Sequence, residues 1–173
     1  HGLSPGMLCP EIVKGFIEIP KGSRAKYEID KASGLLKLDR VLQSSVQYPI
    51  HYGFIPQSLC GDGDPLDILI LCSVDVRPGT IIEARVIGVM NMEDKEEQDD
   101  KIIAVALYDE GVNYINDIKD LPPHTEKEIT QFFKDYKLLE KRAVVVHEFQ
   151  GKEEAYKVLK GCFEAYKNTF TQC

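Results

Sequence analysis

The sequence lacks several patterns that mark common classes of protein. It contains no C-x-x-C pair, P-loop motif, G-x-G-x-x-G or G-x-S-x-G, which removes the zinc-ribbon, P-loop, dinucleotide-binding and serine-hydrolase interpretations. Its four histidines show no pairing at helical spacing, so a zinc site is not indicated either. Any catalytic chemistry in this chain must therefore rest on other residue types.

Cysteine and long apolar runs are also scarce. An odd number of cysteines without a C-x-x-C pair gives no disulfide framework and favours a reducing compartment; the five are Cys9, Cys60, Cys72, Cys162 and Cys173. No apolar run is long enough to span a bilayer, and the first residues lack the basic-then-apolar layout of a signal peptide. We therefore expect a soluble, cytoplasmic protein that does not enter a membrane.

Positive charge is in deficit. Asp and Glu outnumber Lys and Arg by 28 to 21, and the net charge of −7 disfavours non-specific binding to nucleic acid or anionic membranes. A chain of 173 residues with 43% hydrophobic content can bury one core, and it contains neither an internal repeat nor a flexible linker. Residues 1–173 are therefore predicted to form a single domain.

The most informative stretch is residues 61–67 (GDGDPLD), which places Asp62, Asp64 and Asp67 in one turn before an apolar run. Gly and Pro bend the backbone, so the three carboxylates can converge, and hard oxygen ligands suit Mg²⁺ or Mn²⁺. A solvated turn whose Asp side chains cap backbone amides is equally compatible with this stretch alone. An EF-hand fits poorly, because its sixth position would be Asp67 instead of Gly.

A second acidic stretch favours a working site. Residues 93–100 (EDKEEQDD) lie between two strand-like segments, 81–90 and 101–108, and we expect them to form a loop joining neighbouring strands. Two separate acidic loops could clamp more than one metal ion. These loops, with the strands around them, predict an antiparallel, barrel-like sheet.

Periodicity predicts the remaining elements. Strands are expected at 12–19, 25–30, 35–41, 66–72 and 143–146, whereas 48–56 contains too much Pro and Gly for a central strand and is expected to be an ordered loop. A capping box at 125–128 (TEKE) predicts the start of one amphipathic helix, and a second helix follows the last strand. Strands first and helices afterwards indicate an α+β fold.

Four candidate residues have ordinary alternatives at this point. Alternation in 25–30 places Lys26 and Glu28 on one face, which would be a plain solvated face if the strand stood alone. Tyr136 could simply be a core residue of its helix, and Lys137 beside it could be solvated.

Separate segments along the chain share one known pattern. They are residues 17–20 (IEIP), 26–30 (KYEID), 62–67 (DGDPLD) and 99–101 (DDK), with the pairs Tyr48-Pro49, Tyr52-Gly53 and Tyr136-Lys137 and with Asp94. In content, order and spacing they resemble the soluble family I inorganic pyrophosphatases, for which D-G-D-P-x-D is a specific signature. The similarity runs from about residue 9 to residue 149.

The resemblance implies a five-stranded OB-like β-barrel with flanking α-helices. It also implies Mg²⁺-dependent hydrolysis of inorganic pyrophosphate to two orthophosphates by a metal-activated water. Several Mg²⁺ ions, for which Mn²⁺ can substitute, would be held or oriented by Glu18, Glu28, Asp62, Asp67, Asp94 and Asp99. Asp64 would be the general base. The substrate would be bound by Lys26, Arg40, Tyr52, Tyr136 and Lys137, with Tyr48 and Lys101 in supporting positions.

The implied chemistry is consistent with the residues. Two metals sharing one water lower its pKa towards neutrality, and Lys and Arg stabilise the charge that develops on phosphoryl oxygens. Two departures from the family are Lys95-Glu96-Glu97, where bacterial members commonly carry acidic or small residues, and His51, where many carry Asn. Neither departure lies at a position with an implied role.

Two other functions remain to be compared with this one. An OB-like barrel with Tyr48, Tyr52 and Phe54 could stack the bases of single-stranded nucleic acid, although the negative net charge has the wrong sign. A phosphohydrolase for nucleotides or polyphosphate is excluded only by the resemblance. We therefore expect pyrophosphate as a small-molecule substrate, no nucleic-acid or membrane partner, and a chain compatible with homo-oligomers, since the family includes hexamers and smaller assemblies.

Overall fold

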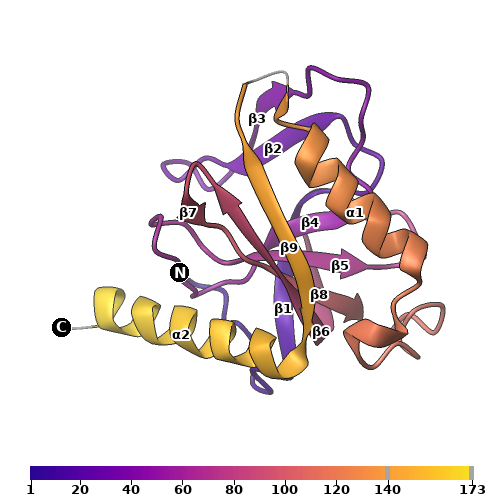
Figure 1. Ribbon diagram of the computed structural model, residues 1–173. Coiled ribbons are helices and arrows are strands. Elements are labelled where there is room, and N and C mark those ends of the chain that lie inside the picture. The colour runs from indigo at the N-terminus through magenta and orange to yellow at the C-terminus, as the bar shows by residue number, and fades with distance from the viewer. Residues whose placement is uncertain (139–140, 172–173) are drawn as a thin grey trace.

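The computed structural model, which describes residues 1–138 and 141–171, places most strands before the helices and confirms the α+β class (Figure 1). The strands are β1 (Ile12–Ile19), β2 (Ala25–Ile29), β3 (Leu36–Val41), β4 (His51–Phe54), β5 (Asp67–Leu71), β6 (Thr80–Asp94), β7 (Glu97–Gln98), β8 (Lys101–Ala106) and β9 (Val144–Gly151). The helices are the 3-10 helix η1 (Ile118–Asp120), α1 (Pro123–Asp135) and α2 (Lys152–Phe170).

The main sheet curls until its ends meet. Five strands follow one another in the order β1, β4, β5, β8 and β6, and β6 then pairs with β1. Strands β7 and β9 extend the sheet from β6, while β2 and β3 form the predicted separate hairpin. The OB-like curl that we expected is therefore formed by five strongly curved strands.

The core has two parts, one on each face of the curled sheet. Because successive side chains of a strand point to opposite faces, Ile103 on β8 packs into the cluster that contains Phe133 of α1. Its neighbour Ile102 packs into the cluster that contains Leu159 of α2. All six residues of β8 are buried, so this central strand is covered on both faces. The two helices accordingly lie on different sides of the sheet in Figure 1.

The prediction of a purely antiparallel sheet is wrong at one pairing. Strands β5 and β8 run parallel, with Asp67 opposite Lys101. A parallel pair needs a crossover between its strands, and the long strand β6 supplies it before β8 returns antiparallel to β6. This parallel register matters for function because it places Lys101 beside Asp67, the last residue of 61–67.

The prediction of a loop at 48–56 is also wrong. Residues 51–54 form β4, which lies between β1 and β5. Gly53 makes this possible, because a Cβ at that position would lie 1.9 Å from the carbonyl oxygen of Phe16 on β1. Pro49 and Pro56 lie outside the strand, where their missing N–H groups cost no ladder bonds.

Residues 93–100 fold differently from the expected loop. Strand β6 continues to Asp94, the chain turns at Lys95 and Glu96, and β7 pairs back onto β6. Both turn residues have positive φ, 54° and 64°, as a two-residue hairpin turn with right-handed strand twist requires. We call residues 93–100 the acidic hairpin and residues 61–67 the carboxylate turn.

The first long helix begins earlier than its predicted capping box. Helix α1 starts at Pro123, and the backbone N–H of Thr125 donates to the carbonyl oxygen of Pro122 at 2.9 Å. Proline at the first helical position has the right φ and lacks an N–H that would need a partner there. Thr125 therefore lies inside the first turn, and the capping box prediction is wrong.

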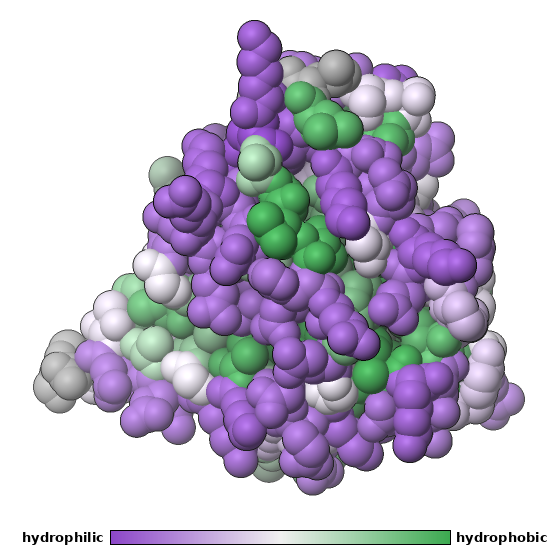
Figure 2. All heavy atoms as spheres, viewed as in Figure 1, coloured by the Kyte–Doolittle hydropathy of each residue, from purple (hydrophilic) through white to green (hydrophobic). Residues whose placement is uncertain are grey.

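Neither long helix combines the length and the apolar content of a bilayer-spanning helix, within the residues that the structure describes. Figure 2 shows the face of Figure 1 covered mainly by hydrophilic side chains, with hydrophobic side chains gathered along β9 and beside α2.

Candidate active site

A buried lysine joins the carboxylate turn to the acidic hairpin. Lys101 Nζ lies 2.7 Å from Asp67 Oδ2 and 3.3 Å from Asp99 Oδ1, and the lysine side chain is only 2% exposed. Asp67 is the first residue of β5 and Lys101 the first of β8, so the parallel register brings them together. Burial alone would lower the pKa of Lys101, but the two carboxylates raise it above its ordinary value.

Aromatic rings form the floor beneath this lysine. Its Nζ lies 5.3 Å from the ring centroids of both Tyr52 and Phe133, within the range of a cation–π contact. Tyr48 packs edge-on to Tyr52 at 5.5 Å and lies 6.4 Å from Tyr136. Tyr136 packs in the core, with 8% of the residue exposed, and at the same time borders this site.

Glu18 and Glu28 approach the same cluster from β1 and β2. The backbone N–H of Ile29 donates to Glu18 Oε2 at 3.1 Å. The pKa of Glu18 is raised to about 7, chiefly by burial, with the nearby charges of Asp67 and Glu28 acting in the same direction and the hydrogen bond from Ile29 opposing them. Glu18 is therefore a carboxyl group that exchanges a proton near neutral pH.

Asp62 and Asp64 stand at the exposed tip of the carboxylate turn. The backbone N–H of Asp64 donates to Asp62 Oδ1 at 3.0 Å, which holds the tip in shape. Burial raises the pKa of Asp62, and the charges of Asp64 and Asp99 add to that effect. Lys31 Nζ lies 3.4 Å from Asp64 Oδ1, but these side chains are 82% and 64% exposed, so the pair is weak. Asp64 is open to water.

Asp94 of the acidic hairpin is held by two cations. Lys137 Nζ donates to Asp94 Oδ2, and Arg142 Nη2 donates to the same oxygen at 3.0 Å. Burial raises the pKa of Asp94, but these two partners hold it below its ordinary value. Lys137 is 5% exposed, so the alternative of a solvated lysine is excluded. Its Nζ also lies 5.2 Å from the Tyr136 ring centroid.

Lys26 and Arg40 face each other across the hairpin of β2 and β3. Both lie near Asp39 Oδ2, at 3.6 Å for Lys26 Nζ and 3.8 Å for Arg40 Nε. The positive charge of Arg40 also acts on the phenol of Tyr136, which places it towards the aromatic floor. A bulge between Lys26 and Tyr27 interrupts the strict alternation predicted for this strand.

The donor set suits a hard cation. Among the described residues, Asp94 Oδ1 is buried and has no hydrogen-bond partner, so a carboxylate oxygen is available inside the site. Clustered carboxylate oxygens are ligands that Mg²⁺ and Mn²⁺ prefer. Within residues 1–138 and 141–171, no three His, Cys, Asp or Glu side chains are placed closely enough to form a ready-made metal site.

Three residues at the site escaped the sequence analysis. Arg142 shares Asp94 with Lys137, Phe133 lies under Lys101, and Asp39 separates Lys26 from Arg40. The basic pair at 141–142, close behind Tyr136-Lys137, was the one available signal for Arg142. Phe133 was expected only as an apolar residue of its helix, because ring-to-ammonium contacts depend on packing between distant segments.

Comparisons with known proteins agree on one family. The family model for inorganic pyrophosphatase matches residues 15–167. A soluble inorganic pyrophosphatase of Oryza sativa subsp. indica is 49% identical over 166 residues, which cover 96% of this chain and 78% of the relative. Soluble inorganic pyrophosphatase 2 of Chlamydomonas reinhardtii is 49% identical over 170 residues, 98% of this chain and 88% of the relative.

Solved structures give the same result. The inorganic pyrophosphatase of Thermus thermophilus matches with a TM-score of 0.92 and 41% identity, covering 95% of this chain and 97% of that one. The enzyme of Helicobacter pylori matches with a TM-score of 0.91 and 42% identity, covering 96% and 99%.

Proposed function

Because the chain belongs to the inorganic pyrophosphatase family, whose members hydrolyse pyrophosphate to phosphate, we propose that the cluster around Lys101 is its active site and that Mg²⁺ is its metal. The observation that carries this proposal is the meeting of the carboxylate turn and the acidic hairpin at one buried lysine. It places acidic side chains from both segments beside the cations that an anionic substrate needs. Residues 1–173 would act as one domain.

The carboxylates are the proposed metal-binding residues: Glu18, Glu28, Asp62, Asp67, Asp94 and Asp99. When bound, Mg²⁺ neutralises phosphate charge and lowers the pKa of water, and Mn²⁺ can substitute for it. Lys101 keeps Asp67 and Asp99 close together, since its own charge offsets their mutual repulsion. Tyr52 supports the same arrangement by hydrogen bonding to Asp67, and Tyr48 packs against Tyr52.

Asp64 is the proposed general base. Its side chain is 64% exposed and has Lys31 as a weak ionic partner, so it can accept a proton from an attacking water. The hydrogen bond from the Asp64 N–H to Asp62 Oδ1 keeps the two residues on one turn. Proton removal and metal binding are thus assigned to different side chains of one turn.

The lysine, arginine and tyrosine side chains near the carboxylates would bind the substrate. Lys26, Arg40 and Lys137 carry the charge that stabilises phosphoryl oxygens, and Tyr136 borders the same space. Lys137 is bonded to Asp94 in the structure, so the same lysine connects a proposed metal ligand to the proposed substrate site.

The test is phosphate release from a panel of pyrophosphate, tripolyphosphate and ATP, with Mg²⁺, with Mn²⁺ and with excess chelator. We expect rapid release from pyrophosphate with Mg²⁺, loss in chelator and recovery on adding Mg²⁺. Full activity in excess EDTA would exclude the metal-dependent mechanism. Preferred hydrolysis of ATP or tripolyphosphate would support the phosphohydrolase alternative instead.

We further propose a cytoplasmic location and self-association into homo-oligomers. Both rest on the family resemblance, and neither helix in the described part of the chain is suited to cross a membrane. Cell fractionation tests the first proposal and sedimentation velocity the second. Recovery in a membrane fraction, or a strictly monomeric species at micromolar concentration, would contradict them.

A further inference from the structure

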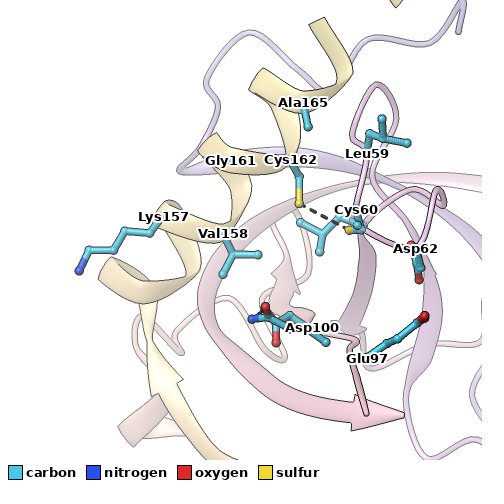
Figure 3. A pocket seen from close by; sticks show the side chains of 13 residues that line it. Leu59, Cys60, Asp62, Glu97, Asp100, Lys157, Val158, Gly161, Cys162 and Ala165 are labelled. Atoms are coloured by element: carbon cyan, nitrogen blue, oxygen red, sulfur yellow. Dashed lines mark hydrogen bonds between the residues drawn. The ribbon is translucent and has the colours of Figure 1, made fainter. Parts of the chain in front are cut away.

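Two thiols meet where the carboxylate turn contacts the last helix. Cys60 directly precedes the turn and Cys162 lies in α2, and their sulfur atoms are 3.5 Å apart although 102 positions separate the residues. Figure 3 shows the two side chains pointing towards each other, with Asp62 near Cys60. Both residues are only partly buried.

The backbone holds these two residues together independently of their side chains. The N–H of Leu59 donates to the carbonyl oxygen of Cys162 at 3.0 Å. On the helix side, Ala155 and Leu159 are fully buried in the core, so α2 is a fixed support. The approach of the thiols therefore follows from the packing of two chain segments.

Cys60 also closes the base of the carboxylate turn. Its N–H donates to the carbonyl oxygen of Asp64 at 2.8 Å, and its carbonyl oxygen accepts from the N–H of Gly63 at 3.0 Å. A displacement of Cys60 is therefore passed to the backbone that carries Asp62 and Asp64.

A small oxidant can reach the pair. Both cysteines line a surface cavity of about 580 Å³, whose other walls include Asp62, Asp100 and Val158. Figure 3 shows Asp100 and Glu97 across the cavity from the cysteines. Cys9 has a different environment, because its thiol donates hydrogen bonds to the backbone carbonyl oxygens of Pro5 and Gly6.

We propose that Cys60 and Cys162 form a redox pair that a hydroperoxide converts into an intramolecular disulfide. One thiol attacks the peroxide, breaking the O–O bond and forming a sulfenic acid while an alcohol or water leaves. The second thiol then attacks the sulfenic sulfur, forming the S–S bond and releasing water. In total two thiols lose two hydrogens and two electrons, and the hydroperoxide takes them up. A dithiol reductant reverses the change.

The disulfide would restrain the turn. An S–S bond is about 2.05 Å long, so the sulfurs must approach by roughly 1.5 Å. Because α2 is anchored in the core, the base of the turn would move more than the helix. This consequence rests on the proposed function: a shifted Asp62 binds metal less well, so oxidised protein would need more Mg²⁺.

The first experiment tests the bond itself. The full chain is treated with hydrogen peroxide and digested without reductant, and the peptides are identified by mass spectrometry. We expect a cross-link between the peptides that carry Cys60 and Cys162, with loss of two hydrogens in the intact mass. Cys60→Ser and Cys162→Ser should each abolish the cross-link, whereas Cys72→Ser, as the matched control, should retain it. If both thiols remain open to alkylation after peroxide treatment, the proposal is wrong.

The second experiment tests the effect on the turn. Mg²⁺ titrations of phosphate release are compared for reduced, oxidised and re-reduced protein, with circular dichroism confirming that the oxidised chain stays folded. We expect the half-saturating Mg²⁺ concentration to rise about tenfold on oxidation, since displacements of about 1 Å near a reacting centre change rates by up to 10²-fold. The rise should be reversed by dithiothreitol and absent in Cys60→Ser.

An unchanged Mg²⁺ requirement in fully cross-linked protein would show that the disulfide does not move the turn. A chain without pyrophosphatase activity would still form the disulfide. Failure of the proposed function and failure of the redox pair therefore give different results.

Discussion

The carboxylate turn and the acidic hairpin have similar compositions, but the tip of the turn and Asp94 of the hairpin have opposite environments. In the turn, Asp62 and Asp64 are exposed, with Asp62 accepting a backbone hydrogen bond and Asp64 lying near Lys31. In the hairpin, Asp94 is nearly buried and is held by Lys137 and Arg142 from a distant segment. The tip of the turn presents its charge to solvent, whereas the charge of Asp94 is offset within the protein.

This difference indicates how the fold tolerates so many carboxylates. Buried anions are costly unless they are paired, and here a lysine offsets three of the deep carboxylates: Lys101 for Asp67 and Asp99, Lys137 for Asp94. The exposed tip needs no such partner. The two regions therefore differ in which variants should change chemistry and which should change stability.

The largest expected effect is within the turn. Asp64→Asn removes the proposed proton acceptor and should lower kcat by about 10²–10⁴-fold, or roughly 3–5 kcal/mol of barrier. Asp62→Asn should instead raise the Mg²⁺ concentration required for activity, because it removes an anionic ligand. Mg²⁺ titrations of kcat across pH separate the two, with Asp67→Asn as a second ligand variant. Rescue of Asp64→Asn by added Mg²⁺ alone would identify Asp64 as a ligand and move the base elsewhere.

The next effect concerns the link between the two regions. Lys101→Met keeps the length of the side chain but leaves Asp67 and Asp99 without their shared cation, so the free energy of unfolding in chelator should fall by about 3 kcal/mol. Mg²⁺ should restore part of this loss, since it also offsets the two charges. Chemical denaturation with and without Mg²⁺ measures both changes. The exposed Lys119→Met variant is the control, and equal stability of the two variants in chelator would show that Lys101 does not hold the site together.

A third comparison uses pH. The pKa of Glu18 is raised to about 7, so this carboxyl must release a proton before it can ligate a cation, whereas the pKa of Asp94 is lowered. Affinity for Mg²⁺ should therefore rise about tenfold between pH 6 and pH 8, equivalent to about 1.4 kcal/mol. Isothermal titration in buffers of different ionisation enthalpy measures the proton release. In Glu18→Gln both the release and this pH dependence should be lost.

In chelator, a rising pH lowers the contribution of Glu18 to folding stability, although the same rise in pH favours Mg²⁺ binding. Glu18 binds its proton more tightly in the folded chain than in the unfolded one, so its contribution to stability is complete below pH 4.5 and is lost as the pH rises through about 7. Denaturation of wild type and Glu18→Gln across this window tests the sign. A wild-type stability that rises relative to the variant over the same window would contradict the protonated state of Glu18.

The smallest expected effect contrasts two ion pairs. Lys31→Ala removes the exposed partner of Asp64 and should change the free energy of unfolding by less than about 0.5 kcal/mol, because exposed pairs are screened by solvent. Arg142→Ala removes one partner of the nearly buried Asp94 and should cost about 1 kcal/mol or more. Thermal unfolding at low and high salt compares them. A larger loss of unfolding free energy in Lys31→Ala than in Arg142→Ala would contradict this difference between the two ion pairs.

Much of the fold could be predicted from local pattern. Strand β1 has its predicted bounds, 12–19, and the hairpin of β2 and β3 is confirmed. The errors have two causes: a neighbour in space overrode local preference, or one local signal was stronger than another. Gly53 fits a strand because Phe16 lies against it, and Pro122 with Pro123 start α1 before the capping box. The roles assigned to the site residues by resemblance stay predictions.

The sequence by itself determined the local chemistry of this protein: an acidic turn bent by Gly and Pro, strands with alternating burial, two amphipathic helices, and membership of a family. Only the tertiary structure decided which cation meets which carboxylate. Lys101 reaches Asp67 across 34 positions and Lys137 reaches Asp94 across 43. Such contacts depend on strand register and on how helices pack against the sheet, and a one-residue slip would turn each side chain to the opposite face. Local periodicity indicates which face a residue occupies, but the partner across the sheet comes from the assembled fold.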